Sequence, residues 1–160
     1  MMATEIERKF LLSDDSWRAQ ADRGNTMRQG YFAGPEKNQQ KASIRVRVDN
    51  DHAFLNIKSY ELGISRQEYE YRIERKDAEK MLDTLCEHPL IEKTRYKVNV
   101  DKHVWEIDVF SGDNLGMVVA EIELQDEHEA FTKPAWLGEE VSGDPRYYNV
   151  CLVQHPYKDW

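Results

Sequence analysis

Residues 5–10 read Glu-Ile-Glu-Arg-Lys-Phe, close to the start of the chain. Successive side chains of an extended strand point to opposite faces, so Glu5, Glu7 and Lys9 share one face of a predicted strand. A single strand of this kind is typical of the solvated face of an antiparallel sheet. Nearly every later strand repeats the pattern, and this repetition makes the charged face the feature that decides the fold.

The same alternation predicts seven further strands along the chain. It is clearest in residues 43–49, where Arg45 and Arg47 alternate with aliphatic side chains. The further strands are predicted at residues 27–33, 43–49, 53–58, 66–73, 91–100, 103–110 and 118–125.

Short helices are predicted between and after these strands. Residues 13–17 have the features of a capped helix start, and Asp77 is predicted to cap a helix that ends at the His-Pro pair at 88–89. A last helix is predicted from residues 144–145, whereas residues 134–138 are expected to be irregular. The apolar residues at helical spacing after Asp77 are interpreted as core: Ala78, Met81, Leu82, Leu85 and Cys86.

Composition and charge limit the classes of protein to consider. The 160 residues carry a formal net charge of −8, with 40% hydrophobic and 32% charged residues. This length is enough to bury one core, and we expect a single domain over residues 1–160. The negative charge argues against a nucleic-acid partner. Cys86 and Cys151 lie far apart without a CxxC spacing, which predicts neither a disulfide framework nor a zinc knuckle.

Targeting signals are not recognisable in the sequence. No signal peptide precedes Glu5, and no apolar run approaches membrane-spanning length. We therefore expect a cytoplasmic protein with no membrane partner, and the sequence gives no indication of its oligomeric state.

The charged residues that share strand faces are largely sorted by sign, with pairs of acids on some strands and pairs of bases on others. The acids in phase are Glu5, Glu7, Glu68, Glu70, Glu106, Asp108, Glu121 and Glu123. The bases in phase are Lys9, Arg45, Arg47, Lys58, Arg66, Lys93 and Arg95.

Two arrangements of these strands are possible, because the opposite faces are apolar and must be covered. The sheet is either open, with its charged face in water, or closed around that face. Eight strands enclose an interior just wide enough for side chains or one small ligand. Such a charged interior has a prohibitive desolvation cost when dry, but water, metal ions and a polyanion would satisfy it. The strand pattern alone leaves both arrangements open.

The residue types indicate phosphate chemistry. Paired carboxylates without Cys or His clusters suit hard cations such as Mg²⁺ or Mn²⁺. Several Arg and Lys side chains that converge on one space suit phosphate oxygens. Acids that hold a metal beside bases that hold phosphates are the general requirement for phosphoryl transfer. The five histidines are scattered and receive no role, and no Walker-type loop is present.

Residues 5–9 resemble the ExExK signature of the CYTH superfamily, the triphosphate tunnel metalloenzymes. Within this superfamily, the chain as a whole most resembles the short bacterial inorganic triphosphatases. An isolated ExExK is a weak signal, but further matching motifs follow in order over almost the whole chain. They are RQGY at 28–31, IRVR at 44–47, SRQEYE at 65–70, EKTRY at 92–96, EIDVF at 106–110, EIE at 121–123 and GEEV at 138–141.

The resemblance implies a β-dominated α+β fold, namely a closed eight-stranded antiparallel β-barrel, or tunnel, with a charged interior and a few peripheral helices. It also implies that the tunnel binds a small-molecule triphosphate and a divalent metal, Mg²⁺ or Mn²⁺. By position, the residues that resemble the metal-side acids of the family are Glu5, Glu7, Asp108, Glu121 and Glu123. Those that resemble its phosphate-binding bases are Lys9, Arg45, Arg47, Lys58, Lys93 and Arg95.

Individual roles also follow from the resemblance. Lys93 aligns with a lysine proposed to position or activate the attacking water, with Tyr31 nearby as a second catalytic candidate. Arg146 matches a basic residue of the family's closing helix and is a substrate-binding candidate. Three further acids either line the tunnel or pair with neighbouring bases: Glu68, Glu70 and Glu106.

The function implied by the resemblance is metal-dependent hydrolysis of inorganic triphosphate to pyrophosphate and phosphate. One alternative is a class IV adenylate cyclase, which makes cyclic AMP and pyrophosphate from ATP. Another is a thiamine or nucleoside triphosphatase, with Trp136 or Tyr147 stacking on the substrate instead of packing in the core. A non-catalytic polyphosphate-binding module is the third, although binding alone would not need the acids.

Overall fold

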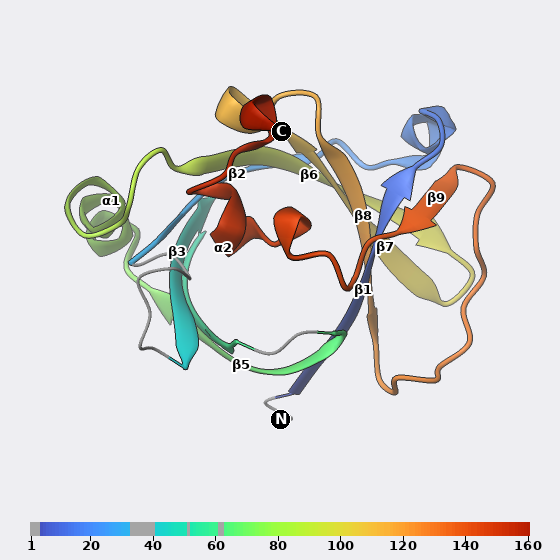
Figure 1. Ribbon diagram of the computed structural model, residues 1–160, viewed down its shortest axis with the longest axis horizontal. Coiled ribbons are helices and arrows are strands. Elements are labelled where there is room, and N and C mark those ends of the chain that lie inside the picture. Colours follow the sequence, from blue (N-terminus) through green and yellow to red (C-terminus); the bar gives the residue numbers. More distant parts are fainter. Residues whose placement is uncertain (1–3, 33–40, 51, 61–62) are drawn as a thin grey trace.

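The computed structural model describes residues 4–32, 41–50, 52–60 and 63–160. Its strands are β1 (Thr4–Leu12), β2 (Asn25–Tyr31), β3 (Ala42–Asp49), β4 (His52–Ser59), β5 (Ser65–Ile73), β6 (Ile91–Val100), β7 (His103–Phe110), β8 (Val118–Leu124) and β9 (Leu137–Glu140). They form one sheet in the order β5-β4-β3-β2-β6-β7-β8-β1-β9. A further pairing of β5 with β1 closes eight of these strands into an antiparallel barrel (Figure 1). The fold is the β-dominated α+β barrel that the resemblance implied.

Strand β1 closes the barrel because it uses both of its edges. One edge pairs with β8 along residues 6–11. The other edge pairs with β5 along residues 4–6 and with β9 along residues 10–12. The charged face of β1 therefore lies inside the barrel, and the closed arrangement is the one that forms.

The apolar outer faces of the strands are covered by helices and loops. Helix α1 (Arg75–Thr84) covers β3 and β4, where it buries Val46 and Leu82. On the far side, Trp105 packs edge to face against Trp136, with ring centroids 5.7 Å apart. The short 3-10 helix η1 (Ser16–Gln20) adds another tryptophan to this second cluster. Because the apolar faces of the strands are buried under these elements, the charged faces point into the barrel.

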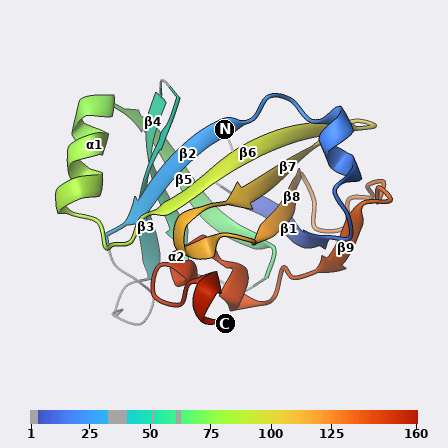
Figure 2. The ribbon, with the colours of Figure 1, turned by 90° about the horizontal axis from the view of Figure 1, so that it is seen from above.

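Residues 141–160, which we call the C-terminal segment, lie across one mouth of the barrel (Figures 1 and 2). Val150 and Leu152 of this segment pack against Phe110 and its apolar neighbours inside the barrel. One end of the interior is therefore partly filled by apolar side chains. The helical elements of the segment are η4 (Pro145–Tyr147), α2 (Asn149–Leu152) and η5 (Tyr157–Asp159).

The predicted strands are close to those observed. Those at residues 91–100 and 103–110 are confirmed with these bounds, and the others differ by one or two residues at one or both ends. Residue 33, where the second strand was expected to end, lies outside the described residues.

The expectation that residues 134–138 are irregular is wrong at their end, because β9 begins at Leu137. Gly138 allows this pairing, since a Cβ added to it would lie 2.9 Å from the carbonyl oxygen of Leu11. The free half of one β1 edge thus gains a partner that the sequence pattern does not reveal.

Helix α1 begins earlier than predicted. Glu74, and not Asp77, is its N-cap residue, and the helix ends at Thr84, well before the His-Pro pair. Leu85 is 57% exposed because it follows the last helical turn, so its assignment to the core is wrong. Other residues of the predicted stripe, Ala78, Leu82 and Cys86, are buried.

The last helix begins where it was predicted, but as a 3-10 turn. The Asp144 side chain accepts a hydrogen bond from the backbone N–H of Arg146 and so caps η4. The helix start predicted at residues 13–17 corresponds to η1, which begins at Ser16. None of the helices in the described part of the chain has the length and apolar character needed to cross a membrane.

Candidate active site

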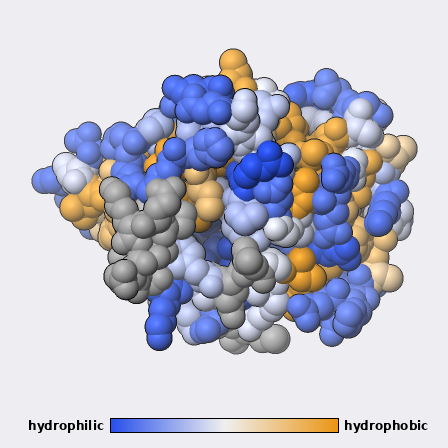
Figure 3. All heavy atoms as spheres, in the orientation of Figure 1, coloured by the Kyte–Doolittle hydropathy of each residue, from blue (hydrophilic) through white to orange (hydrophobic). Residues whose placement is uncertain are grey.

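The inward faces of the barrel strands enclose a cavity of about 340 Å³. Figure 3 shows that the face seen in Figure 1 is hollowed near its centre, with hydrophilic residues around the hollow. The cavity brings together most of the site residues predicted from the sequence. Those that line it are Glu5, Glu7, Lys9, Tyr31, Arg45, Arg47, Lys58, Lys93, Arg95, Glu121 and Glu123.

The three acids whose roles were left open also line the cavity, and each pairs with a base. Glu68 lies 3.5 Å from Lys58, and Glu70 lies 3.7 Å from Arg47. Glu106 lies 3.4 Å from Arg95. Each of these acids therefore both lines the cavity and pairs with a base, so the two alternatives proposed for them are both true.

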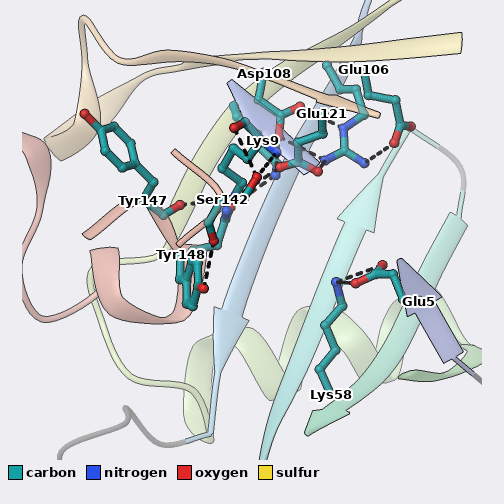
Figure 4. Close-up of polar contacts among 12 residues, drawn as sticks. Glu5, Lys9, Lys58, Glu106, Asp108, Glu121, Ser142, Tyr147 and Tyr148 are labelled. Carbon is teal, nitrogen blue, oxygen red and sulfur yellow. Dashed lines mark hydrogen bonds and ion pairs between the residues drawn. The ribbon is translucent and has the colours of Figure 1, made fainter. Parts of the chain in front are cut away.

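Glu5 is held by bases from β4 and β5. Lys58 Nζ donates to its two carboxylate oxygens at 3.0 and 3.2 Å (Figure 4), and Arg66 Nε lies 3.5 Å away. Burial alone would raise the pKa of Glu5, but the positive charges of Lys58 and Arg66 outweigh it and lower the pKa. Glu5 is thus a charged carboxylate at one side of the cavity.

Three carboxylates from β1 and β8 form the most acidic part of the wall. Burial and the nearby charge of Glu121 raise the pKa of Glu7 well above its usual range. Burial would also raise the pKa of Glu121, but Lys9 and Arg95 outweigh it and hold this pKa well below the usual range. The pKa of Glu123 is raised by burial and by the charge of Glu5.

This acidic wall fits a divalent metal by the chemistry of its donors. Carboxylate oxygens are the ligands that Mg²⁺ and Mn²⁺ prefer, and a cation held by these acids would relieve the unfavourable burial of negative charge there. Within the described ranges, no group of three or more acids, histidines or cysteines already converges as a metal site.

Arginines on β3 form the basic part of the wall. The Nε atoms of Arg45 and Arg47 are buried and find no hydrogen-bond partner among the residues that the structure describes. Burial, together with the charges of Arg45 and Arg95, lowers the pKa of Arg47 to about 10. Buried guanidinium groups with unused donors are suited to an anion with several oxygens, such as a phosphate.

Asp108 lies behind the cavity wall, not on its surface. Its carboxylate is fully buried and accepts hydrogen bonds from Lys93 Nζ at 2.7 Å and from Arg95 Nε at 2.7 Å. Burial would raise the pKa of Asp108, but the charges of Arg95 and Lys93 outweigh it and lower the pKa. Both oxygens are engaged with cations, so the carboxylate orients these two bases.

Lys93 is the most deeply buried base of the site, with a side chain only 1% exposed. Burial and the nearby charge of Arg95 lower its pKa to about 8, although the charge of Asp108 opposes this shift. A lysine with such a pKa exchanges a proton near neutral pH, as a general acid or base requires.

Arg146, Trp136 and Tyr147 do not line the cavity. The Arg146 side chain is 55% exposed and pairs with Asp144 at 2.8 Å. Trp136 packs outside the barrel in the aromatic cluster, as the core alternative expected. Tyr147 is also buried in an apolar cluster, and its backbone carbonyl accepts a hydrogen bond from Lys9 Nζ at 3.1 Å (Figure 4).

Four lining residues were not predicted: Ser43, Tyr148, Asn149 and Val150. Ser43 is in phase with Arg45 on β3, so the strand alternation contained a signal for it. The other three belong to the C-terminal segment, where no periodic pattern indicates which side chains face the barrel.

A closed barrel with acids on one wall and bases on the opposite wall carries the two kinds of group that enzymes of phosphoryl transfer combine. Comparison with known sequences is in agreement with this class of enzymes. The CYTH domain model matches residues 3–148, and the chain belongs to the CYTH domain family.

Two relatives with assigned names match nearly the full chain. An inorganic triphosphatase of Acetivibrio thermocellus is 49% identical over 160 residues, which cover 99% of both chains. An inorganic triphosphatase of Nitrosomonas europaea is 39% identical over 156 residues, which cover 94% of this chain and 97% of the relative. Among solved structures, the crystal structure of the inorganic triphosphatase NE1496 superposes with a TM-score of 0.64 at 34% identity, covering 92% of this chain and 96% of the other.

Proposed function

We propose that this protein is a hydrolase that converts inorganic triphosphate to pyrophosphate and phosphate with the help of a divalent metal. The observation that carries the proposal is a single cavity with an acidic wall on β1 and β8 facing buried arginines on β3. The near-full-length similarity to relatives named inorganic triphosphatase supports the same reaction.

The basic residues would bind the substrate. Arg45 and Arg47 carry unused buried donors, and guanidinium groups bind phosphate oxygens in a bidentate way. Lys9 and Lys58 add point charges from other strands. Most of the catalytic effect in phosphoryl transfer comes from such positioning and charge neutralisation.

The acidic residues would hold the metal, with Mg²⁺ or Mn²⁺ as the expected ions. The candidate ligands that line the cavity are Glu5, Glu7, Glu121 and Glu123. When bound, the metal would act as a Lewis acid that polarises phosphate oxygens. The metal role predicted for Asp108 stays a prediction, and its contacts favour the orientation of Lys93 and Arg95 instead.

Lys93 would act on the attacking water. In this mechanism, the water oxygen attacks the terminal phosphorus in line, and the bond from that phosphorus to the bridging oxygen breaks. Pyrophosphate leaves, and the neutral amine of Lys93 takes the proton of the water. A pKa of about 8 supplies this neutral amine at mildly alkaline pH. Tyr31 lines the same cavity and is the second candidate for positioning the water.

The deciding experiment measures the products from tripolyphosphate, ATP and thiamine triphosphate with Mg²⁺ and with Mn²⁺. We expect pyrophosphate and phosphate in equal amounts from tripolyphosphate, with higher kcat/KM than for the other substrates. Cyclic AMP from ATP would identify a cyclase, and faster thiamine triphosphate hydrolysis would identify that substrate. Tight tripolyphosphate binding in calorimetry without turnover, with either metal, would indicate a binding module.

The substrate-binding role of Arg146 and the cytoplasmic location of the protein stay predictions. Arg146→Ala tests the first prediction, because loss of a substrate-binding residue should raise the KM for tripolyphosphate.

A further inference from the structure

We infer that Asn149, in the C-terminal segment, is a positioning residue that fixes the amine of Lys93 for the chemical step. This inference deepens the proposed function and rests on it. Asn149 was not among the site residues predicted from the sequence, which in this segment were Arg146 and, as an alternative, Tyr147.

The carboxamide oxygen of Asn149 accepts two hydrogen bonds. Lys93 Nζ donates to it at 3.1 Å, and Gln29 Nε2 donates to it at 2.9 Å. Gln29 is fully buried and does not line the cavity, so its amide acts on the site only through Asn149. The second donor fixes the direction in which the Asn149 oxygen faces.

The contact with Asn149 completes the orientation of the lysine amine. A lysine nitrogen has three positions, besides its bond to carbon, that hold a proton or a lone pair. Asp108 takes one of these positions at 2.7 Å, and Asn149 takes the second at 3.1 Å. The third is left for a water or a phosphate oxygen in the cavity that Lys93 lines.

Asn149 is itself held in place by its neighbours. Lys9 Nζ donates to the carbonyl of Tyr147, and the Tyr148 hydroxyl donates to the carbonyl of Ser142 at 3.0 Å (Figure 4). The next residue, Val150, is buried in the apolar cluster at the mouth of the barrel. The C-terminal segment therefore acts as a support that presents one acceptor to Lys93.

Loss of this acceptor affects the reaction in a specific way. Without it, Nζ keeps the ion pair with Asp108 but is free to rotate about that contact, so its third position no longer has a fixed direction. Misplacement of a reacting group slows the chemical step, whereas the arginines and lysines that bind the phosphates are unchanged. We therefore expect a lower kcat with a nearly constant KM.

The test compares two substitutions of similar size at one position. Asn149→Leu removes the acceptor, and we expect kcat for tripolyphosphate to fall about 10- to 100-fold. Asn149→Asp keeps an acceptor oxygen in the same place but adds a negative charge, which raises the pKa of Lys93. We therefore expect it to retain most of the wild-type kcat when both enzymes are compared on the alkaline plateau of their pH profiles, with the acid limb of the profile moved to higher pH. Asn99→Leu, at an exposed position near the end of β6, is the matched control and should leave kcat unchanged. Thermal unfolding of each variant confirms folding.

Gln29→Leu extends the test to a residue that cannot touch the substrate. We expect a smaller loss of kcat in the same direction, and no further loss when it is combined with Asn149→Leu, because the two residues act in one chain. This variant also keeps the inference testable if Asn149→Leu does not fold.

Several results would overturn the inference. Asn149→Leu with an unchanged kcat and a higher KM would show that Asn149 binds substrate directly. If Asn149→Asp is as slow as Asn149→Leu even at the alkaline plateau, where Lys93 is neutral in both, the acceptor oxygen is not what the reaction needs. An active wild-type enzyme with any of these outcomes leaves the proposed function intact. A wild-type protein without turnover would overturn both.

Discussion

Glu7 on β1 and Glu123 on β8 stand directly opposite each other, so two carboxylates share one register position of the barrel. Like charges directly across a strand pair are destabilising. The pKa of each is raised above its ordinary value, chiefly by burial and by neighbouring acids. The barrel thus maintains an arrangement that is unfavourable by itself, which is expected where a cation is to be bound.

We predict that Glu7→Gln stabilises the metal-free protein while it abolishes metal-dependent turnover. Burial and the charges of Glu121 and Glu5 raise the pKa of Glu7, so a neutral amide at this position removes a cost of folding. It should raise the free energy of unfolding by about 1 kcal/mol. Addition of Mg²⁺ should raise the unfolding midpoint of the wild type more than that of the variant. Thermal unfolding with and without Mg²⁺ measures both effects, and Glu92→Gln, at an exposed position of β6, is the control. An equal Mg²⁺ response in both proteins would contradict the role of Glu7.

The pH dependence of turnover should follow Lys93. Its pKa is lowered to about 8, chiefly by burial, so the neutral amine is lost as the pH falls through this value. If that amine takes the proton of water, kcat must decline on the acid side of about pH 8. Rates at saturating tripolyphosphate from about pH 6 to about pH 10 test this prediction. Lys93→Arg, whose guanidinium stays charged, should be nearly inactive throughout. A flat profile in the wild type would exclude Lys93 as the base.

Asp108→Asn separates two roles for this carboxylate. If Asp108 orients Lys93 and Arg95, the variant removes the negative charge that both buried bases contact most closely. It should then lower the free energy of unfolding of the metal-free protein by about 3 kcal/mol, without changing the stabilisation by Mg²⁺. Urea unfolding with and without Mg²⁺ gives both quantities. A variant that is tolerated without metal but no longer responds to Mg²⁺ would instead identify a metal ligand.

The two cysteines should differ in reactivity. Burial raises the pKa of the Cys86 thiol to about 11, so very little thiolate exists at neutral pH. Cys151 is less deeply buried than Cys86. We expect iodoacetamide to label Cys151 before Cys86 in the native protein, and both in urea. Mass spectrometry of Cys86→Ser and Cys151→Ser measures the labelling of each cysteine separately. Rapid labelling of Cys86 in the native protein would contradict the prediction, because it would show that the packing around this thiol opens easily.

The barrel strands could be predicted well from the sequence because their side chains alternate with a period of two. One face of each strand is charged and lines the cavity, and the other is apolar and packs in the core. Strands such as β6 and β7 carry charges on one side and apolar residues on the other, so their bounds were visible. Closure of the sheet was not visible in this way, because it depends on which strands meet at β1. The resemblance to a known family resolved that ambiguity.

The contributions of irregular segments could not be predicted. Strand β9 forms because β1 has a free half-edge and Gly138 allows close approach, which is a tertiary condition. Asn149 faces Lys93 because the whole C-terminal segment folds across the mouth, and nothing in its local sequence marks this side chain. Periodicity likewise placed Asp108 on the charged face, but the depth at which it lies depends on its contacts with Lys93 and Arg95.

The double pairing of β1 has a consequence for how the molecule is made. Strand β1 is synthesised before its partners β8 and β9, and it can pair with them only after residues 118–140 have been synthesised. Until then, residues 7–12 of β1 lack the strand partners of the finished barrel, and an unpaired edge is a template for association with other chains. Ring closure therefore belongs to the late stages of folding, and it is slow because its contacts join distant parts of the chain. The nascent protein is most vulnerable to aggregation in this interval.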